Sequence, residues 1–391
     1  MVAGALACEL NVVNSAVRPR LKKPQLSTWL QFASTQGGAR LTTYSDLDRG
    51  AFSGLIKGDL MKQSRVCMLG GLGLALALMS GTSLAQAPAQ VNTQVPGYYR
   101  LAVGDYEVTA LFDGYNDLSP KLLDGLTQDQ IRALLARRSI ETPGVQTAFN
   151  AFLVNTGKQL ILVDTGAGQC IGATAGLLSA NMKAAGYQPE QVDTILLTHL
   201  HLDHVCGLVD GQQKPVFANA TVYAAKAEAD YWLDPQAMAK APAGAREFFK
   251  IAQDSTAPYI AAGRFKTFTA GQSPVPGVVD AELEAGHTPG STTYRFNSQG
   301  QSILFMGDLV HNLAVQFEHP EVSIRFDVDN QQAIKSRAKV FSDAAASKIW
   351  VTAAHLPFPG VGHITAVDKH FQWVPIEYGP YKRAAKVPMI E

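Results

Sequence analysis

The chain has 391 residues, of which 47% are hydrophobic and 17% are charged, so a disordered protein is excluded and a large buried core is expected. Residues 1–87 carry nine Lys/Arg and four Asp/Glu, which leaves 24 basic and 29 acidic residues in the remainder. This acidic balance argues against nucleic acid as a partner, because nucleic-acid-binding surfaces are basic.

The N-terminal region contains a secretory signal pattern that starts late in the chain. A short basic start at residues 61–65 precedes an apolar stretch at residues 68–79, which is too short to span a bilayer. Ala85-Gln86-Ala87 then forms a small-x-small cleavage site. We therefore expect residues 1–60 to be a misplaced start, 61–87 a signal peptide, 88–95 a linker and 96–391 one domain. The mature protein is expected to be periplasmic or secreted, without a membrane partner.

Strands and helices alternate in the predicted domain. Its elements, in chain order, are strands from residue 98 to a turn at Asp113-Gly114, a helix at 128–138, a hairpin of 151–154 with 160–163, a helix at 173–185 and a strand at 192–198. A second round has strands near 221–223 and 303–306, with helices near 225–231 and 331–341. The order predicts an α/β protein of two similar halves.

Cys170 and Cys206 are the only cysteines after residue 87. Two cysteines do not make a disulfide framework, and small buried thiols are the commoner use of such residues. We expect two free thiols, although an oxidising periplasm would permit one bridge.

A cluster of polar residues, Thr198-His199-Leu200-His201-Leu202-Asp203-His204, follows the apolar strand at 192–197. Three imidazoles and a carboxylate within six positions exceed what one tetrahedral zinc ion needs, but they are enough to begin two adjacent metal sites. His199 and His201 are two residues apart on an extended segment, so their side chains point the same way.

Further candidate ligands follow at turns and strand ends. His287 lies in the turn-rich segment Glu284-Ala285-Gly286-His287-Thr288-Pro289-Gly290. Asp308 and His355 each follow an apolar run, at 302–307 and 349–354. Each residue alone is a weak signal, but together with the first cluster they predict a two-metal centre.

His-x-His-x-Asp-His, a Gly-His turn, a Gly-Asp after a strand and a late His together resemble the metallo-β-lactamase fold superfamily. The resemblance implies an αβ/βα four-layer sandwich of two mixed sheets flanked by helices. It implies one metal held by His199, His201 and His287, a second held by Asp203, His204 and His355, and Asp308 bridging the two. Asp164, at the end of the strand at 160–163, is expected to orient a ligand rather than bind metal.

Segments between Pro96 and Tyr378 are similar to the methyl parathion hydrolase family, including Pro96-Gly97-Tyr98-Tyr99-Arg100 and the run at 355–364. This similarity implies hydrolysis of organophosphate triesters by a metal-bridging hydroxide, which Asp203 and Asp308 orient. A lactonase or aryl esterase with the same metal centre is the main alternative. A β-lactamase, a redox member of the fold and a non-catalytic metal-binding protein are weaker alternatives.

The substrate pocket is predicted from four residues. Trp232 and Phe249 belong to a long aromatic segment, residues 225–268, that is expected to form a lid or pocket wall. Ile171 and His311 stand where the family resemblance implies a phenylalanine and an aliphatic residue, so the resemblance leaves the substrate preference open. His311 is a candidate general acid, and an equally good interpretation is a surface or supporting histidine.

Five imidazoles and two carboxylates favour zinc over magnesium or calcium, with manganese, cobalt or cadmium able to substitute. We expect two divalent ions per chain and a small-molecule substrate. The sequence leaves a homodimer open.

Overall fold

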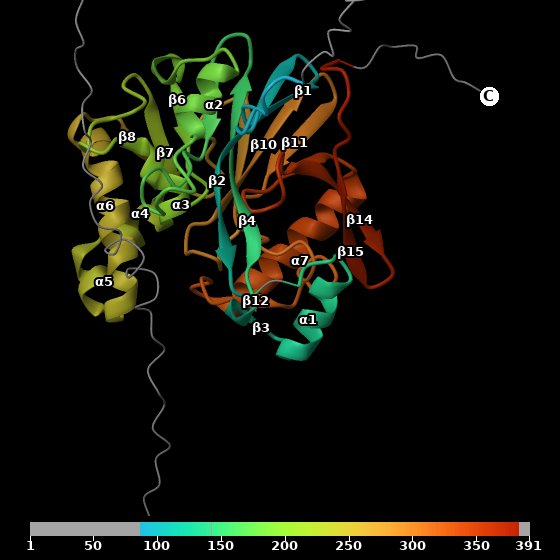
Figure 1. Cartoon of the computed structure of the whole chain (residues 1–391). Coiled ribbons are helices and arrows are strands. Elements are labelled where there is room, and N and C mark those ends of the chain that lie inside the picture. Colours follow the sequence, from blue (N-terminus) through green and yellow to red (C-terminus); the bar gives the residue numbers. More distant parts are fainter. Residues whose placement is uncertain (1–86, 142, 383–391) are drawn as a thin grey trace, which may run out of the picture. The chain divides into compact units, whose positions relative to one another are not determined.

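Two mixed β-sheets form the body of the protein in the computed structural model, which describes residues 87–141 and 143–382 (Figure 1). The first sheet has seven strands in the order β1 (Tyr98–Val103), β2 (Tyr106–Leu118), β4 (Val145–Asn155), β5 (Leu160–Val163), β6 (Thr194–Leu196), β7 (Thr221–Ala225) and β8 (Phe265–Phe268). The second has six, in the order β15 (His370–Pro375), β14 (Val361–Val367), β13 (Trp350–Thr352), β11 (Gln301–Phe305), β10 (Thr292–Ser298) and β9 (Val279–Leu283). β3 (Leu123–Asp124) and β12 (Ser323–Ile324) form a separate pair.

The helices are α1 (Gln128–Ala136), α2 (Leu178–Ala184), α3 (Leu202–Val205), α4 (Lys226–Trp232), α5 (Pro235–Lys240), α6 (Arg246–Ala261) and α7 (Asn330–Ser347). Helices α2 to α6 pack on the outer side of the first sheet and α7 on that of the second, whereas α1 packs in a separate cluster. The predicted extension 1–60 and all but Ala87 of the predicted signal peptide lie outside the described residues. Within the described residues, no helix combines the length and the apolar character needed to cross a membrane.

Alternation along the buried strands explains the four layers. In β5, Ile161 and Val163 point into the core between the sheets, whereas Leu160 and Leu162 face the helices on the outer side. Successive side chains of a strand point to opposite faces, so a strand covered on both faces becomes a continuous apolar run. The second sheet packs its outer face against α7 in the same way. The predicted αβ/βα sandwich of the metallo-β-lactamase type is confirmed.

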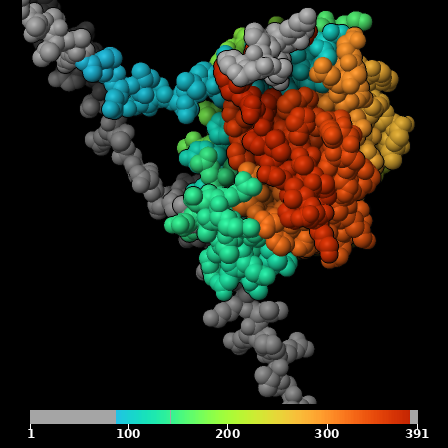
Figure 2. Space-filling model, turned by 90° about the vertical axis from the view of Figure 1, so that its right-hand side faces the viewer, coloured from blue at the N-terminus to red at the C-terminus, as the bar shows by residue number. Residues whose placement is uncertain are grey.

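On the face shown in Figure 2, the C-terminal segment, drawn in orange and red, lies next to the green segment that contains α1. Ile131, Leu134 and Leu135 of α1 pack with Val315, Val322 and Ile324 in a separate apolar cluster. The predicted helix at 128–138 is therefore confirmed, with its end two residues earlier, and it supports the loop that follows Asp308.

The predicted turn at Asp113-Gly114 is wrong. β2 continues through both residues with a bulge between Phe112 and Gly114. The Asp113 carboxylate accepts hydrogen bonds from the backbone N–H groups of Ala167 and Leu178, at 2.8 and 2.9 Å. The dipeptide therefore anchors the loop after β5 instead of reversing the chain.

The predicted helix at 173–185 is shorter than expected, because α2 begins only at Leu178. Gly176 just before it has a φ of 90°, a left-handed conformation that an α-helix excludes. The other predicted helices, at 225–231 and 331–341, correspond to α4 and α7, and the predicted hairpin is the antiparallel pair β4–β5.

Candidate metal centre

The predicted ligands meet at one edge of the two sheets, beyond the ends of β6, β11 and β13. His199 and His201 follow β6, and His201 is the N-cap of the short helix α3, which carries Asp203 and His204. Asp308 follows β11 and His355 follows β13, which runs parallel to β11. The ends of parallel neighbours lie at the same edge of a sheet, which is why residues 47 positions apart in the chain come together.

The first group of ligand atoms belongs to His199, His201, His287 and Asp308, all of them buried and within 4.8 Å of one another. His287 Nε2 lies 3.0 Å from His201 Nδ1 and 3.3 Å from Asp308 Oδ2. His199 Nε2 lies 3.6 Å from the same carboxylate oxygen.

The second group consists of Asp203, His204, Asp308 and His355. His355 Nε2 lies 2.8 Å from Asp308 Oδ2 and 3.3 Å from Asp203 Oδ2, and His204 Nε2 lies 3.1 Å from Asp308 Oδ1. Asp308 is the only residue that belongs to both groups. The structure therefore brings together all seven predicted ligands, with Asp308 between the two sets.

Three buried polar atoms in these groups form no hydrogen bond of suitable geometry: His199 Nε2, His204 Nε2 and Asp308 Oδ1, although the last two lie 3.1 Å apart. A buried polar atom without a partner costs free energy, so each should be satisfied by something bound. All three atoms point into the space shared by the other ligand atoms. The donor set thus fits two divalent cations, one in each group.

The histidines also shape the charge of Asp308. Burial favours its neutral form, but the imidazoles of His204, His355, His199 and His311 outweigh this effect and hold the pKa of Asp308 well below its usual range. The carboxylate is therefore ionised and able to act as a ligand for a cation.

Carboxylates behind the ligands fix the orientation of two histidine rings. Asp164 Oδ2 lies 2.9 Å from His204 Nδ1, and this side chain also accepts hydrogen bonds from the N–H and hydroxyl of Thr198. Asp327 Oδ1 lies 2.8 Å from His287 Nδ1. Such partners hold a ligand ring in place. Asp164 has the predicted position, whereas Asp327 was not predicted because its loop has no strand-end pattern.

Replacing Asp164 with asparagine should weaken the binding of one metal ion by about 10- to 100-fold, the usual effect of losing such a partner. The amide cannot accept all three hydrogen bonds, so the His204 ring loses its support. Calorimetric titration of the metal-free protein measures this change. Asp327→Asn is the matched control and should weaken the other ion, which His287 would bind. Unchanged binding of both ions in Asp164→Asn would refute the assigned role.

Aromatic rings border His201. Trp232, at the end of α4, lies 5.1 Å from it between ring centroids, and Phe248 of α6 lies 5.9 Å away. Phe249, which was predicted to contact substrate, is 1% exposed and packs on Trp232 at 4.6 Å. The segment 225–268 therefore supplies both core residues and one wall of the centre. Phe248 was not predicted at the site, because two adjacent phenylalanines in one segment give no sequence signal that shows which of them faces the metal centre.

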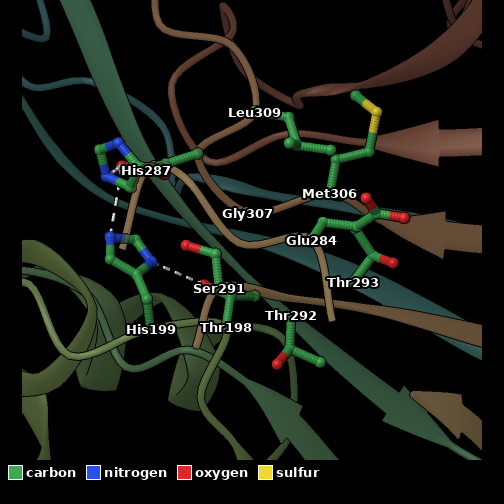
Figure 3. A pocket seen from close by; sticks show the side chains of 11 residues that line it. Thr198, His199, Glu284, His287, Ser291, Thr292, Thr293, Met306, Gly307 and Leu309 are labelled. Atoms are coloured by element: carbon green, nitrogen blue, oxygen red, sulfur yellow. Dashed lines mark hydrogen bonds and ion pairs between the residues drawn. The ribbon is translucent and has the colours of Figure 1, made fainter. Parts of the chain in front are cut away.

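Two cavities adjoin the centre. The first encloses about 210 Å³, including its opening, with His199 and His287 on one side and Glu284 and Thr293 on the other (Figure 3). The second, of about 230 Å³, is lined by His311 and Asn312 together with residues from the end of β2 and from β12.

His311 lies between the metal groups and the second cavity. Its Nε2 is 3.2 Å from Asp308 Oδ2, while its buried Nδ1 has no hydrogen-bond partner. Burial disfavours the charged ring and lowers its pKa to about 4. Ile171 is half-buried in the loop after β5.

The expectation of two free thiols is wrong, because Cys170 and Cys206 form a disulfide with a Cα–Cα distance of 6.2 Å. Cys206 follows α3 directly, and Cys170 is exposed in the loop that carries Ile171. The backbone N–H of Thr165 in the same loop donates to the carbonyl of His204. The bridge thus ties the loop to the segment of the second metal group, a proximity that the sequence spacing of 36 residues does not reveal.

The sequence profile of the metallo-beta-lactamase superfamily matches residues 147–346, just over half of the chain. The chain belongs to this superfamily. A solved structure described as hydrolase AbOPH in the beta-lactamase superfamily is 45% identical, with a TM-score of 0.71, over 74% of this chain and 100% of the other.

Two further solved structures are similar to this superfamily member. AidC, described as a dizinc quorum-quenching lactonase in complex with a product, is 26% identical with a TM-score of 0.67, over 73% of this chain and 99% of AidC. A probable metal-dependent hydrolase from Staphylococcus aureus is 18% identical with a TM-score of 0.59, over 72% of this chain and 100% of the other. This likeness shows only that the two proteins share a fold. Comparison with curated proteins gave no match.

Proposed function

We propose that this protein is a dinuclear-metal hydrolase of neutral esters, with organophosphate triesters as the first substrate class. The observation that carries the proposal is the position of Asp308, whose carboxylate lies among the ligand atoms of both groups. Zinc is the metal that five imidazoles and two carboxylates favour, and manganese, cobalt or cadmium are able to replace it.

The charges around the centre support a neutral substrate. Among the described residues, neither Asp203 nor Asp308 forms an ion pair with a lysine or arginine. Arg337, which lies behind the centre, donates its hydrogen bonds to the backbone carbonyls of Leu309, Pro320 and Val322. In the described structure, neither cavity beside the centre is lined by a lysine or arginine that could bind the carboxylate of a β-lactam drug or the charge of a phosphodiester, which favours triesters, lactones and aryl esters.

When bound, two divalent ions supply a hydroxide nucleophile near neutral pH and stabilise the charge that develops on a phosphoryl or carbonyl oxygen. Asp308 fixes the spacing of the two ligand groups. Asp203 is the more exposed carboxylate, with 16% of its side chain accessible, so it can accept a proton from the solvent side. His311 Nε2 lies 3.2 Å from Asp308 Oδ2, so this ring can orient a substrate group at the metal centre.

The second cavity is small, with room for about one water molecule. Its apolar lining comes from Leu118, Pro120, Leu123 and Ile324, and its polar groups are His311, Asn312, Thr147 and Ser119. This cavity therefore does not enclose an aryl ring or an acyl chain.

Hydrolysis of lactones or aryl esters is the second candidate. The similarity to AidC favours this activity, because AidC is described as a dizinc lactonase and the match covers 99% of its length. Ile171 supports it as well, because a side chain smaller than phenylalanine leaves room for an acyl chain.

Kinetics of the zinc-loaded protein on a methyl phosphotriester, a phenyl ester and a medium-chain lactone test the proposal. The highest kcat/KM on the phosphotriester supports the first candidate, and the highest value on the lactone or ester supports the second. If none of the three substrates is hydrolysed, both candidate functions are refuted.

Trp232→Ala should raise KM by about tenfold or more, since a lost apolar contact worth about 1.4 kcal/mol in ground and transition state has that effect. Metal content should stay the same, because all seven ligands and the hydrogen bonds of Glu228 remain. The matched control is Phe249→Leu, which removes packing against Trp232 without touching His201. If Trp232→Ala leaves KM unchanged for all three substrates, residues 225–268 form core only.

We also propose export to the periplasm with cleavage near Ala87. The disulfide between Cys170 and Cys206 supports this location, because disulfides persist in oxidising compartments. Fractionation and N-terminal mass spectrometry should find an extracytoplasmic protein that begins at Pro88 or within a few residues of it. A mature chain that retains peptides from before Met61 would contradict the assignment.

A further inference from the structure

A buried carboxylate outside the seven ligands lies between the two loops that carry the first metal group. Glu228, in the first turn of α4, is fully buried. Its Oε1 accepts a hydrogen bond from the backbone N–H of Leu200 at 2.9 Å, and its Oε2 accepts one from the N–H of Gly290 at 2.8 Å. Leu200 stands between His199 and His201, and Gly290 is three residues after His287.

Burying the Glu228 carboxylate costs free energy, so the contacts that it makes there should serve a purpose. A buried carboxylate loses its hydration, and burial raises the pKa of Glu228. Among the described residues it forms no ion pair, and the groups that offset the loss of hydration are the backbone N–H groups of Leu200 and Gly290 and the side chain of Thr288, next to His287. The fit is also tight, since a Cβ added at Gly290 would lie 2.3 Å from the backbone nitrogen of Glu228.

The same helix contacts the first group a second time. Trp232 lies one turn after Glu228, and its ring packs against His201. The second group has different supports: Asp164 contacts His204, and the carbonyl of Ala148 contacts His355 Nδ1. Within the described residues, Glu228 makes no hydrogen bond or ion pair with Asp203, His204 or His355. In the described structure, α4 is therefore specific to the first group.

We propose that Glu228 is a positioning residue that holds the His199–His201 loop and the His287 loop at the separation that the first metal ion requires. The inference rests on the proposed dinuclear centre. It assigns Glu228 no contact with substrate and no ligand bond.

Glu228→Gln is the sharpest variant, because it keeps the size of the side chain but turns one acceptor oxygen into an NH₂ group. That group would face a backbone N–H, so one of the two loops loses its hydrogen bond. Titration of the metal-free full chain with Co²⁺ or Zn²⁺ should show about 10- to 100-fold weaker binding of one ion and unchanged binding of the other. The visible spectrum of the one-Co²⁺ form should match that of His199→Ala and differ from that of His355→Ala.

Asp113→Asn is the matched control, since Asp113 is an equally buried carboxylate that accepts hydrogen bonds from two backbone N–H groups, those of Ala167 and Leu178. It should lose stability without a selective loss at the first position. Equal weakening of both ions in Glu228→Gln, or wild-type binding of both, would overturn the inference.

Gly290→Ala tests the same contact if Glu228→Gln does not fold, because its methyl group would push the loop away from α4. The expected result is again a selective loss of one ion, and wild-type binding of both ions would overturn the inference. A wild-type protein that binds fewer than two ions would instead refute the proposed function itself, so the two failures are distinguishable.

Discussion

Replacing Asp308 with alanine should reduce the metal content from two ions per chain to one or fewer and lower turnover by about 10³-fold or more. Asp308 is the only residue shared by both ligand groups, so its loss removes a ligand from each. A loss of about 4 kcal/mol of transition-state stabilisation corresponds to this decrease in rate. Elemental analysis and steady-state kinetics of the same preparation measure both quantities.

Single-group variants provide the comparison for Asp308→Ala. His199→Ala and His355→Ala each remove one ligand from one group and should bring the metal content to one or below, also with loss of activity. The Asp113→Asn variant should still bind two ions and have the wild-type turnover rate, because Asp113 belongs to neither ligand group. Two tightly bound ions in Asp308→Ala would show that this carboxylate is not the bridge.

Removing the disulfide with the double variant Cys170→Ser/Cys206→Ser should lower the free energy of unfolding by about 2–4 kcal/mol. A cross-link that closes a loop of this length restricts the unfolded chain, and the entropy of loop closure gives a value near the upper end of that range. Urea unfolding of the oxidised wild type and the double variant, followed by fluorescence, measures the difference.

Reduction of the wild type with a dithiol should produce the same loss of stability, since Cys170 is exposed and accessible to the reductant. The double variant is the control and should not respond to the dithiol. Equal unfolding midpoints for the oxidised protein, the reduced protein and the variant would contradict a stabilising role for the bridge.

The ligand set could be predicted from the sequence because the ligands follow apolar strands closely or lie in a turn, and the fold family fixes which of these segments meet. Asp164 could be predicted for the same reason, since it ends β5 next to β6. The four layers were implied by the family resemblance, and the structure explains them by strands that are apolar on both faces, such as β5.

Residues that act across loops could not be predicted in this way. Asp327 contacts His287 from 40 residues away, and Glu228 joins backbone groups of two loops that are 90 residues apart. Neither residue has a local pattern that differs from an ordinary exposed acid. The turn predicted at Asp113-Gly114 was wrong for a related reason. These residue types favour turns, but the Asp113 carboxylate accepts a hydrogen bond from the loop after β5, and the chain continues as a strand.

The most direct test of the two-metal centre is a measurement of metal content and turnover on one preparation of the full protein before and after removal of metal. Elemental analysis should find two divalent ions per chain, a chelator should abolish hydrolysis of the preferred ester, and added zinc should restore it as the second ion binds. A metal-free preparation that retains full activity would contradict the account.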